Sequence, residues 1–301
     1  MKRLTGITLV VLLLSAGLSG ADVVTMDDGD AGFSITDASM PRTKGGNYDG
    51  DCYLNLAGET ATWTPTLSAG VWAVAVWNPT DTTSIVDATT TVNHANGSSA
   101  YTFRQTSVGG QWAGLGFYSF DGVGDSVTVT NASNYGYADA VQWISADEQP
   151  TLDFQLGQTF AWSDDGNWGT AKSGQDRISD TAGAVATWGV DIQPGTYTID
   201  FEFLKDKYRS PDTIVQVWDS GTQLGGDLIV DQYSDTNPDS TRVIENLGQY
   251  TFTGNRMEVK VIASGNQYAS SDGLQVTLVP EPATMSLLAI GAFGAVLRRR
   301  K

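Results

Sequence analysis

The sequence has very few of the residues on which common enzyme and metal sites depend. Among 301 residues it has one cysteine, Cys52, and one histidine, His94. One cysteine excludes an intramolecular disulfide and a cysteine-rich metal site, and one histidine excludes the HExxH zinc motif. No GxSxG pattern is present that could supply the nucleophile of a serine triad with His94. These absences favour a packing role for Cys52 and a structural role for His94.

Charged residues are also scarce, at 17%, and the basic ones are the rarer kind. The formal net charge is −17, from 17 basic and 34 acidic side chains. Six of the basic residues lie in the two ends of the chain, which leaves 11 basic and 33 acidic residues between them, a charge of −22. Such a surface is repelled by nucleic acid phosphates and by anionic lipid. We therefore expect a soluble exported protein that does not bind nucleic acid.

Long amphipathic helical stripes are absent from the chain between its ends, and strand patterns take their place. Apolar and polar residues alternate through YTFRQ, LGFYSF, SVTVT and AVQWI within residues 86–144, and Gly or Asn clusters separate these runs. The run GVWAVAVW, residues 70–77, places a core on one face and small side chains, apart from Trp77, on the other. The pattern predicts an all-β protein of short antiparallel strands.

The second half of the chain repeats the pattern of the first half. ATWGVDIQPGTYTIDFEF echoes ATWTPTLSAGVWAVAVW, with Trp188 in the place of Trp63, and the closing run SDGLQV echoes ADAVQW. A copy of about 125 residues is long enough to bury a core of its own. We therefore predict two tandem jelly-roll-like β-sandwich domains, residues 22–147 and 150–279, joined by a short polar segment.

The two ends of the chain have the composition of targeting segments. Residues 1–21 consist of MKR, an apolar run and the small-residue stretch SAGLSGA, which predicts a signal peptide that signal peptidase removes after Ala21. Residues 280–301 combine a Pro-Glu-Pro tripeptide, a 13-residue apolar run and a basic end. The residues that define this tail are Pro280, Glu281, Pro282, Arg298, Arg299 and Arg300.

The apolar run of the tail is short for a transmembrane helix. Thirteen residues span about 20 Å as a helix, whereas the hydrocarbon core is about 30 Å thick. We therefore expect a sorting tail that tethers the protein only transiently, before the tail is removed. A permanent anchor with its arginines on the inner side is the alternative.

Two parts of the chain resemble known families. The tail VPEPATMSLLAIGAFGAVLRRRK resembles the PEP-CTERM sorting signal, which implies cleavage near the Pro-Glu-Pro tripeptide by an exosortase in a Gram-negative bacterium that makes exopolysaccharide. The runs TTTVNHANGSSAYTFRQ, GGQWAGLGFYSF and GYADAVQWI resemble the golvesin-like domain. That resemblance implies a β-sandwich of the kind attached to xanthan lyases and regarded as carbohydrate-binding-like. His94 lies in the VxH hairpin of that family, and Ala95 stands where a second histidine is often found.

Sugar binding needs flat apolar side chains that stack on pyranose rings, beside polar groups that bond to hydroxyls. The candidates are Trp77, Trp112, Tyr135 and Tyr137 in the first domain, and Trp162, Trp168, Tyr208 and Trp218 in the second. The alternative for each candidate is a place in the core. For four other tryptophans, Trp63, Trp72, Trp143 and Trp188, we predict a core position because they lie in strand patterns. Trp162 and Trp168 flank the polar run SDDGN, which predicts two exposed indoles in a sugar- or Ca²⁺-binding loop.

Calcium is the one cofactor that the sequence leaves open. Asp27, Asp28 and Asp30 near the start, and Asp164 and Asp165 further on, supply hard oxygen ligands. Neither group fits the twelve-residue calcium loop that ends in glutamate. A calcium site with ligands scattered along the chain is therefore neither predicted nor excluded.

The sequence predicts an exported protein of the cell surface or extracellular matrix that binds polysaccharide, or exopolysaccharide, without catalysis. A structural or adhesive matrix protein without sugar specificity is the alternative. A polysaccharide hydrolase or lyase is less favoured, although two suitably spaced carboxylates would suffice for glycoside hydrolysis. The predicted partners are thus polysaccharide, exosortase and signal peptidase.

Overall fold

The computed structural model describes residues 22–36, 41–42, 46–80, 87–105, 109–131, 135–155, 161–170, 177–235 and 241–280. This part of the chain is nearly all β, with one short 3-10 helix, η2 (Ala146–Glu148), which confirms the predicted all-β class. The predicted signal peptide, residues 1–21, and the tail beyond Pro280 lie outside the described residues. Within the described ranges no helix is long and apolar enough to cross a membrane.

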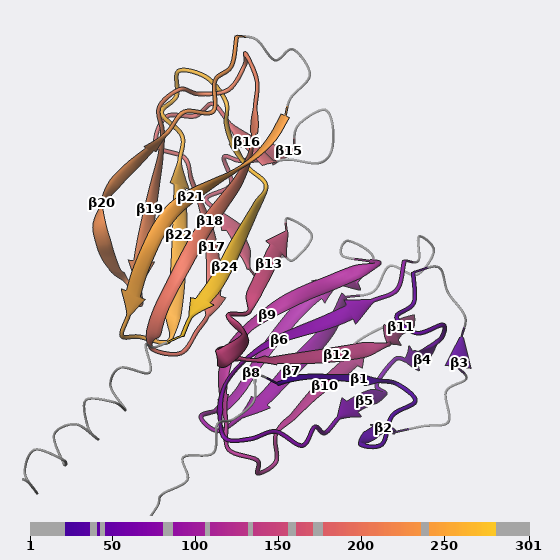
Figure 1. Cartoon of the computed structure of the whole chain (residues 1–301). Helices are drawn as coiled ribbons and strands as arrows, with labels where there is room; N and C mark the ends of the chain where they lie inside the picture. The colour runs from indigo at the N-terminus through magenta and orange to yellow at the C-terminus, as the bar shows by residue number, and fades with distance from the viewer. Residues whose placement is uncertain are drawn as a thin grey trace, which may run out of the picture.

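The strands of residues 22–148, here called the first lobe, form two sheets and a small third one (Figure 1). The larger sheets have the strand orders β1-β12-β6-β9 and β2-β5-β10-β7-β8, and the small sheet has the order β11-β4-β3. The bounds are β1 (Val23–Asp27), β2 (Phe33–Ile35), β3 (Pro41–Arg42), β4 (Cys52–Leu56), β5 (Thr60–Trp63), β6 (Gly70–Asn78), β7 (Asp87–His94), β8 (Gly97–Arg104), β9 (Gln111–Phe120), β10 (Ser126–Asn131), β11 (Tyr135–Ala138) and β12 (Ala140–Ser145).

The strands of residues 150–279, the second lobe, are arranged in the same way. Their orders are β13-β24-β18-β21, β14-β17-β22-β19-β20 and β23-β16-β15. The bounds are β13 (Thr151–Gln155), β14 (Trp162–Asp164), β15 (Gly169–Thr170), β16 (Arg177–Ser179), β17 (Val185–Asp191), β18 (Gly195–Lys205), β19 (Thr213–Asp219), β20 (Thr222–Val230), β21 (Thr241–Phe252), β22 (Arg256–Ile262), β23 (Ala269–Ser271) and β24 (Gly273–Val279). Taken in chain order, each strand of the first lobe has a counterpart with the same neighbours in the second.

The alternation in the sequence explains how these sheets bury their cores. Strand β6 has the buried residues Trp72, Val74 and Val76 on one face, where they pack in the core of the first lobe. Because successive side chains of a strand point to opposite faces, one residue in two reaches the space between the sheets. The four tryptophans predicted to be core, Trp63, Trp72, Trp143 and Trp188, are almost completely buried, which confirms that prediction.

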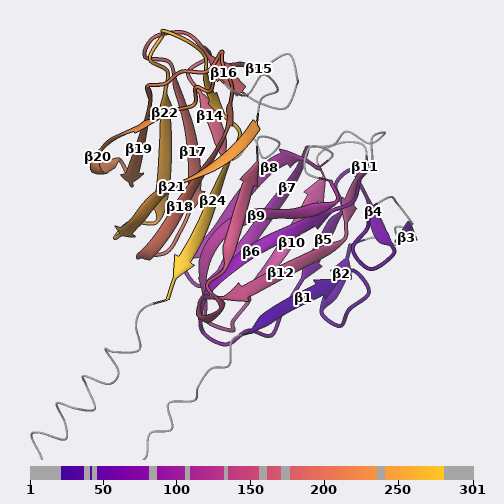
Figure 2. The same cartoon turned by 45° about the horizontal axis from the view of Figure 1, so that its top comes forward.

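Strand β9 joins the two lobes (Figures 1 and 2). It pairs with β6 in the first lobe and lies against β13 and β17 of the second, forming a parallel bridge between Gly116 and Asp191. Through this bridge the order β1-β12-β6-β9 continues into β17-β22-β19-β20, and with β14 these strands make up one nine-stranded sheet that runs through both lobes. The face of β6 and β9 that is turned away from the first core packs in the second: Ala73, Ala75 and Phe117 belong to the second lobe's apolar cluster. The small side chains of that face therefore make room for the other lobe.

Gly116 permits this close approach. Its φ is +152°, and a Cβ atom at this position would lie 2.6 Å from the main-chain oxygen of Asp191 and 2.7 Å from the hydroxyl of Tyr118. Both contacts are far inside van der Waals distance, so a larger residue would force β9 and β17 apart. Gly116 is thus required for the close approach of β9 and β17 at this point of the junction.

Candidate functional site

Trp162 and Trp168, predicted to be exposed, are buried in the second lobe. They are 8% and 6% exposed, and the ring centroid of Trp162 lies 5.1 Å from that of Trp188 and 5.9 Å from that of Trp168. Strand β14 pairs with β17 so that Trp162 stands opposite Trp188, which turns its indole into the core. The prediction of two exposed indoles is therefore wrong, and neither ring offers a face to a sugar.

Tyr137 is also unsuited to stacking on a sugar, because it is 3% exposed. Gln105 fixes its strand by donating to the main-chain oxygen of Tyr137 at 2.7 Å and accepting from its nitrogen at 2.8 Å. Tyr135 lies in the same strand, β11, and its side chain is outside the described part of the chain. The prediction of a platform at Tyr137 is thus wrong as well.

Trp77 and Trp112 do come together. They are opposite each other on β6 and β9, with ring centroids 5.3 Å apart, and both are half-buried. The ring of Tyr48, which the sequence analysis missed, packs edge-on at 5.8 Å from Trp77 and 5.3 Å from Trp112. The indole N–H of Trp77 donates to the main-chain oxygen of Gly46 at 2.7 Å. These three rings form an aromatic trio on the first lobe.

The remaining two candidates each carry a lysine over the ring. Tyr208 is 61% exposed, with the Nζ atom of Lys207 5.0 Å from its centroid. Trp218 is half-buried, with Nζ of Lys260 at 3.8 Å. The cation on Trp218 is close enough to occupy the face that a sugar would use.

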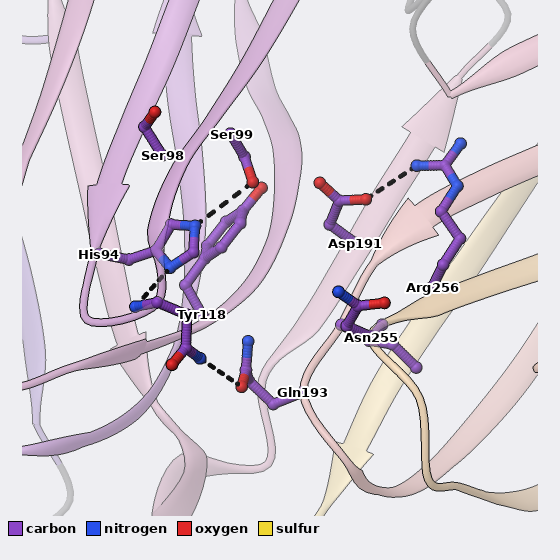
Figure 3. A pocket seen from close by; sticks show the side chains of 10 residues that line it. His94, Ser98, Ser99, Tyr118, Asp191, Gln193, Asn255 and Arg256 are labelled. Carbon is purple, nitrogen blue, oxygen red and sulfur yellow. Dashed lines mark hydrogen bonds and ion pairs between the residues drawn. The ribbon is translucent and has the colours of Figure 1, made fainter. Parts of the chain in front are cut away.

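A polar pocket of about 370 Å³ lies between the lobes (Figure 3). One wall comes from the β7–β8 hairpin and β9, and carries His94, Ser99 and Tyr118. The opposite wall carries Asp191 at the end of β17 and Arg256 at the start of β22. Figure 3 shows these side chains directed into the space between the two walls.

His94 is held as a neutral ring on the first wall. Its Nε2 atom lies 3.3 Å from the hydroxyl of Ser99, and its Nδ1 accepts the main-chain N–H of Asn96 at 3.3 Å. Its ring lies against that of Tyr118, with centroids 5.0 Å apart. Burial lowers the pKa of His94, and this outweighs the opposite effect of Asp191 and Asp125. A neutral imidazole agrees with a ring nitrogen that accepts a hydrogen bond.

Asp191 and Arg256 form the centre of the second wall. One carboxylate oxygen of Asp191 accepts from Nη1 of Arg256 at 2.8 Å, and the other accepts from the hydroxyl of Tyr101, across the junction. Gly189 allows this geometry, because a Cβ there would lie 2.1 Å from Nη2 of Arg256. The guanidinium group therefore rests directly on the backbone of β17.

Gln193 ties the two walls together. Its side-chain oxygen accepts from Ser119 at 3.0 Å and from the amide of Asn96 at 3.3 Å, both in the first lobe. The pocket is thus closed at one side by side-chain hydrogen bonds between the lobes, in addition to the packing of β9.

Comparison with protein families identifies two parts of the chain. Residues 24–145 match the model of the Golvesin C-terminal domain. The first lobe is similar to that family, and we call it the golvesin domain after this match. Residues 278–301 match the PEP-CTERM protein-sorting motif, so the golvesin domain belongs to an exported protein that carries the sorting signal read by exosortases. Both resemblances drawn from the sequence are confirmed.

No curated protein matches the chain. Solved structures match the chain at low similarity. A Paenibacillus xanthan lyase is 16% identical, with a TM-score of 0.39, and the match covers 82% of this chain and 25% of that one. The CBM22-1–CBM22-2 tandem domain of Paenibacillus barcinonensis Xyn10C is 11% identical, with a TM-score of 0.28 and coverages of 87% and 91%. The ANXUR2 extracellular domain of Arabidopsis thaliana is 8% identical, with a TM-score of 0.31 and coverages of 86% and 97%. The chain thus spans about a quarter of the length of that lyase.

The chemistry of the pocket suits hydrogen bonding better than proton transfer. Asn255 and Ser98 add an amide and a hydroxyl to the groups already described, and Asp191 balances the charge of Arg256. Tyr118, the one phenol in the lining, is buried beside Tyr101 and Asp191, which raises its pKa well above its ordinary value. It therefore stays protonated and does not act as a base.

The second acidic group that the sequence offered for Ca²⁺ is engaged in its own turn. Asp164 accepts the N–H of Gly166 at 2.6 Å, and Asp165 accepts from Asn167 at 3.1 Å and from Val185 at 2.9 Å. Both carboxylates are exposed. They accept main-chain N–H groups of the turn that follows β14 and of Val185 at the start of β17.

Proposed function

We propose that the protein contacts polysaccharide at the cell surface or in the extracellular matrix without catalysing a reaction, and that the pocket between the lobes is the contact site. The mature protein would consist of residues 22–279, made of two related β-sandwich domains, 22–147 and 150–279. Signal peptidase would release its N-terminus after Ala21. Exosortase would act near the Pro-Glu-Pro tripeptide, after a transient membrane contact of the tail.

The observation that carries this proposal is the lining of the pocket. Its volume of about 370 Å³ falls in the range of small-molecule sites, about 300–1,000 Å³. Three amides, two serine hydroxyls and the Arg256 guanidinium present planar or short hydrogen-bonding groups, and Asp191 balances the charge of the guanidinium. Such groups match the hydroxyls of a sugar, which are paired on adjacent carbons and carry no charge themselves.

The aromatic trio is a second point where a glycan chain would touch the golvesin domain. Trp77 and Trp112 keep part of their rings exposed, and the exposed ring of Tyr208 offers a further contact on the second lobe. Trp218 is the weaker candidate, because Lys260 lies over its ring.

A structural or adhesive role without sugar specificity is the competing function. It is favoured by the junction, where β9 packs in both cores and Gln193 and Asp191 bond across the lobes. A joint of this kind holds the lobes as one rigid spacer. For a hydrolase or lyase, Tyr118 would not serve as the base because its pKa is raised, and the neutral His94 is a lining group that could accept a proton.

The test is binding of residues 22–279 to a panel of immobilised neutral and acidic polysaccharides, followed on affinity gels. The double variant Ser98→Ala/Asn255→Ala removes one exposed polar side chain from each wall, and Asp227→Ala on β20 is the control. Retardation that the double variant loses and the control keeps supports the proposal. Absence of retardation, with concentration-dependent self-association instead, supports the adhesive role, and release of reducing ends or unsaturated sugars supports an enzyme.

A further inference from the structure

A group of acidic side chains lies at one end of the golvesin domain, remote in sequence from the polar pocket. Asp27 ends β1, Asp28 follows it, and Asp139 precedes β12. In the antiparallel pairing of these strands Asp27 stands opposite Ala140, so the next pair in the register is Asp28 and Asp139. The loop 46–51 covers them: Tyr48 donates its main-chain N–H to both carboxylate oxygens of Asp139, at 3.2 and 3.3 Å.

The carboxylates are close enough to affect one another. Burial raises the pKa of Asp28 to about 7, and the charges of Asp27 and Asp51 act in the same direction. Burial likewise raises the pKa of Asp139 to about 8, with further contributions from Asp27, Asp28 and Asp51. Four acids therefore meet in one region, where each makes the ionisation of the others less favourable.

One oxygen of this group is buried and has no partner. Asp28 is 3% exposed, and its carboxylate accepts main-chain N–H groups, but Oδ2 makes no hydrogen bond. The same holds for the buried Oδ1 of Asp27. A buried carboxylate oxygen without a partner is costly, and proteins offset that cost with a hydrogen bond, a basic side chain or a bound cation.

The second lobe solves the corresponding problem with arginine. Its buried Asp206 lies 3.7 Å from the buried guanidinium of Arg209, and its buried Glu202 lies 2.8 Å from Arg242. In the first lobe, as far as the structure describes it, no ion pair joins Asp27, Asp28, Asp51 or Asp139 to a basic side chain. Among the described side chains, these acids thus have no counterpart of Arg209 or Arg242; the side chains of Arg42, Lys44 and Arg104, the basic residues of this lobe, lie outside the described part.

We propose that Asp28 and Asp139 bind one Ca²⁺ ion, which interacts with the buried Oδ2 of Asp28. Oxygen is the ligand atom that Ca²⁺ prefers, and its six to eight ligands include main-chain carbonyls, amides and water. Within the described residues, no group of three or more carboxylate, histidine or cysteine side chains is already arranged to hold a metal ion. The ion would therefore be completed by oxygens of the loop 46–51, including the amide of Asn47, and by water. The absence of histidine and thiol ligands disfavours zinc.

The proposed ion has a consequence for the aromatic trio. Tyr48 is bonded to Asp139 through its main chain, and its ring packs on Trp77 and Trp112. An ion between Asp28 and Asp139 would fix the loop that carries Tyr48. Calcium would thus order the aromatic surface as well as stabilise the golvesin domain.

Thermal unfolding of residues 22–279 tests the site. The protein is freed of metal with EDTA and then titrated with Ca²⁺ or Mg²⁺, as wild type, Asp28→Asn, Asp139→Asn and the exposed control Asp180→Asn. We expect Ca²⁺ to raise the Tm of the wild type and of the control to a plateau, with a midpoint of about 10⁻⁴ to 10⁻³ M, as for other extracellular modules. Asp28→Asn should unfold no earlier than the metal-free wild type, because it removes a buried charge, and should not respond to Ca²⁺.

Two results would overturn the site. In the first, Ca²⁺ does not change the Tm of the wild type, but the Asp28→Asn variant has a higher Tm than the wild type. This result would mean that the acids are protonated in the folded protein. The other is an equal Ca²⁺ response in wild type and both variants, which would place the ion elsewhere. If the variants do not fold, equilibrium dialysis of the wild type decides, since the proposal requires one Ca²⁺ per chain and less than 0.5 would contradict it.

Discussion

Replacing Asp191 with alanine should weaken the junction between the lobes by an amount that the structure allows us to estimate. The ion pair with Arg256 is partly exposed, at 26% and 40% for the two side chains, so it contributes at most about 1 kcal/mol. The bond from the buried hydroxyl of Tyr101 goes to a charged acceptor, which is worth about 1.5–3 kcal/mol. Tyr101 keeps a second partner in Tyr118, so the lower end of that range applies.

We therefore expect Asp191→Ala to lower the free energy of unfolding by about 2 kcal/mol, or the Tm by about 4–8 °C if the lobes unfold together. Urea and thermal unfolding of residues 22–279 would measure both. Asp227→Ala is the matched control, since it removes an exposed carboxylate that accepts from Gln216 and Gln223 and should change stability by less than about 0.5 kcal/mol. If the two variants were equally stable, Asp191 would not hold the lobes together.

Three further predictions concern packing and charge. Burial lowers the pKa of His94 in the folded protein, so protonation favours the unfolded state and stability should fall as the pH drops below about 6.5. Between pH 7.5 and pH 5 the wild type should lose more stability than the His94→Gln variant. Equal losses in the two proteins would disprove the neutral imidazole. Trp162→Ala should cost about 3–5 kcal/mol in urea unfolding because the indole is core, whereas an unchanged stability would restore it as a surface platform. Gly116→Ala should destabilise the protein by about 2 kcal/mol more than Gly58→Ala. Both glycines have positive φ, but only Gly116 has atoms within 3 Å of the added Cβ. An equal effect of the two substitutions would show that the lobes tolerate a wider gap.

Much of the fold could be predicted from the alternation of side chains. Trp72, Val74 and Val76 alternate with small residues along β6, which is enough to name the core face. The small residues on the opposite face, Ala73 and Ala75, were themselves a signal, because a sheet face that is small and apolar invites close packing by another layer. Its partner could not be named from the sequence, since Leu152 and Phe154 lie almost 80 residues further along the chain.

The sites were harder to predict, because exposure depends on pairings that the local sequence does not encode. The run SDDGN between Trp162 and Trp168 is polar, yet the pairing of β14 with β17 turns Trp162 inward. Likewise, Asn96 and Gln193 look like ordinary turn residues, and only the approach of β9 to β17 brings them within hydrogen-bonding distance. A single histidine suggested no site at all, although His94 lines the pocket.

Calorimetry tests the central claim most directly. It would measure the affinity of residues 22–279 for an oligosaccharide derived from the polysaccharide that retards the protein on affinity gels. Wild type and Asp227→Ala should bind equally. Ser98→Ala/Asn255→Ala should bind about tenfold more weakly, the loss expected for two hydrogen bonds, with an unchanged Tm. Equal affinities of all three proteins, or no binding by the wild type, would contradict a glycan site between the lobes.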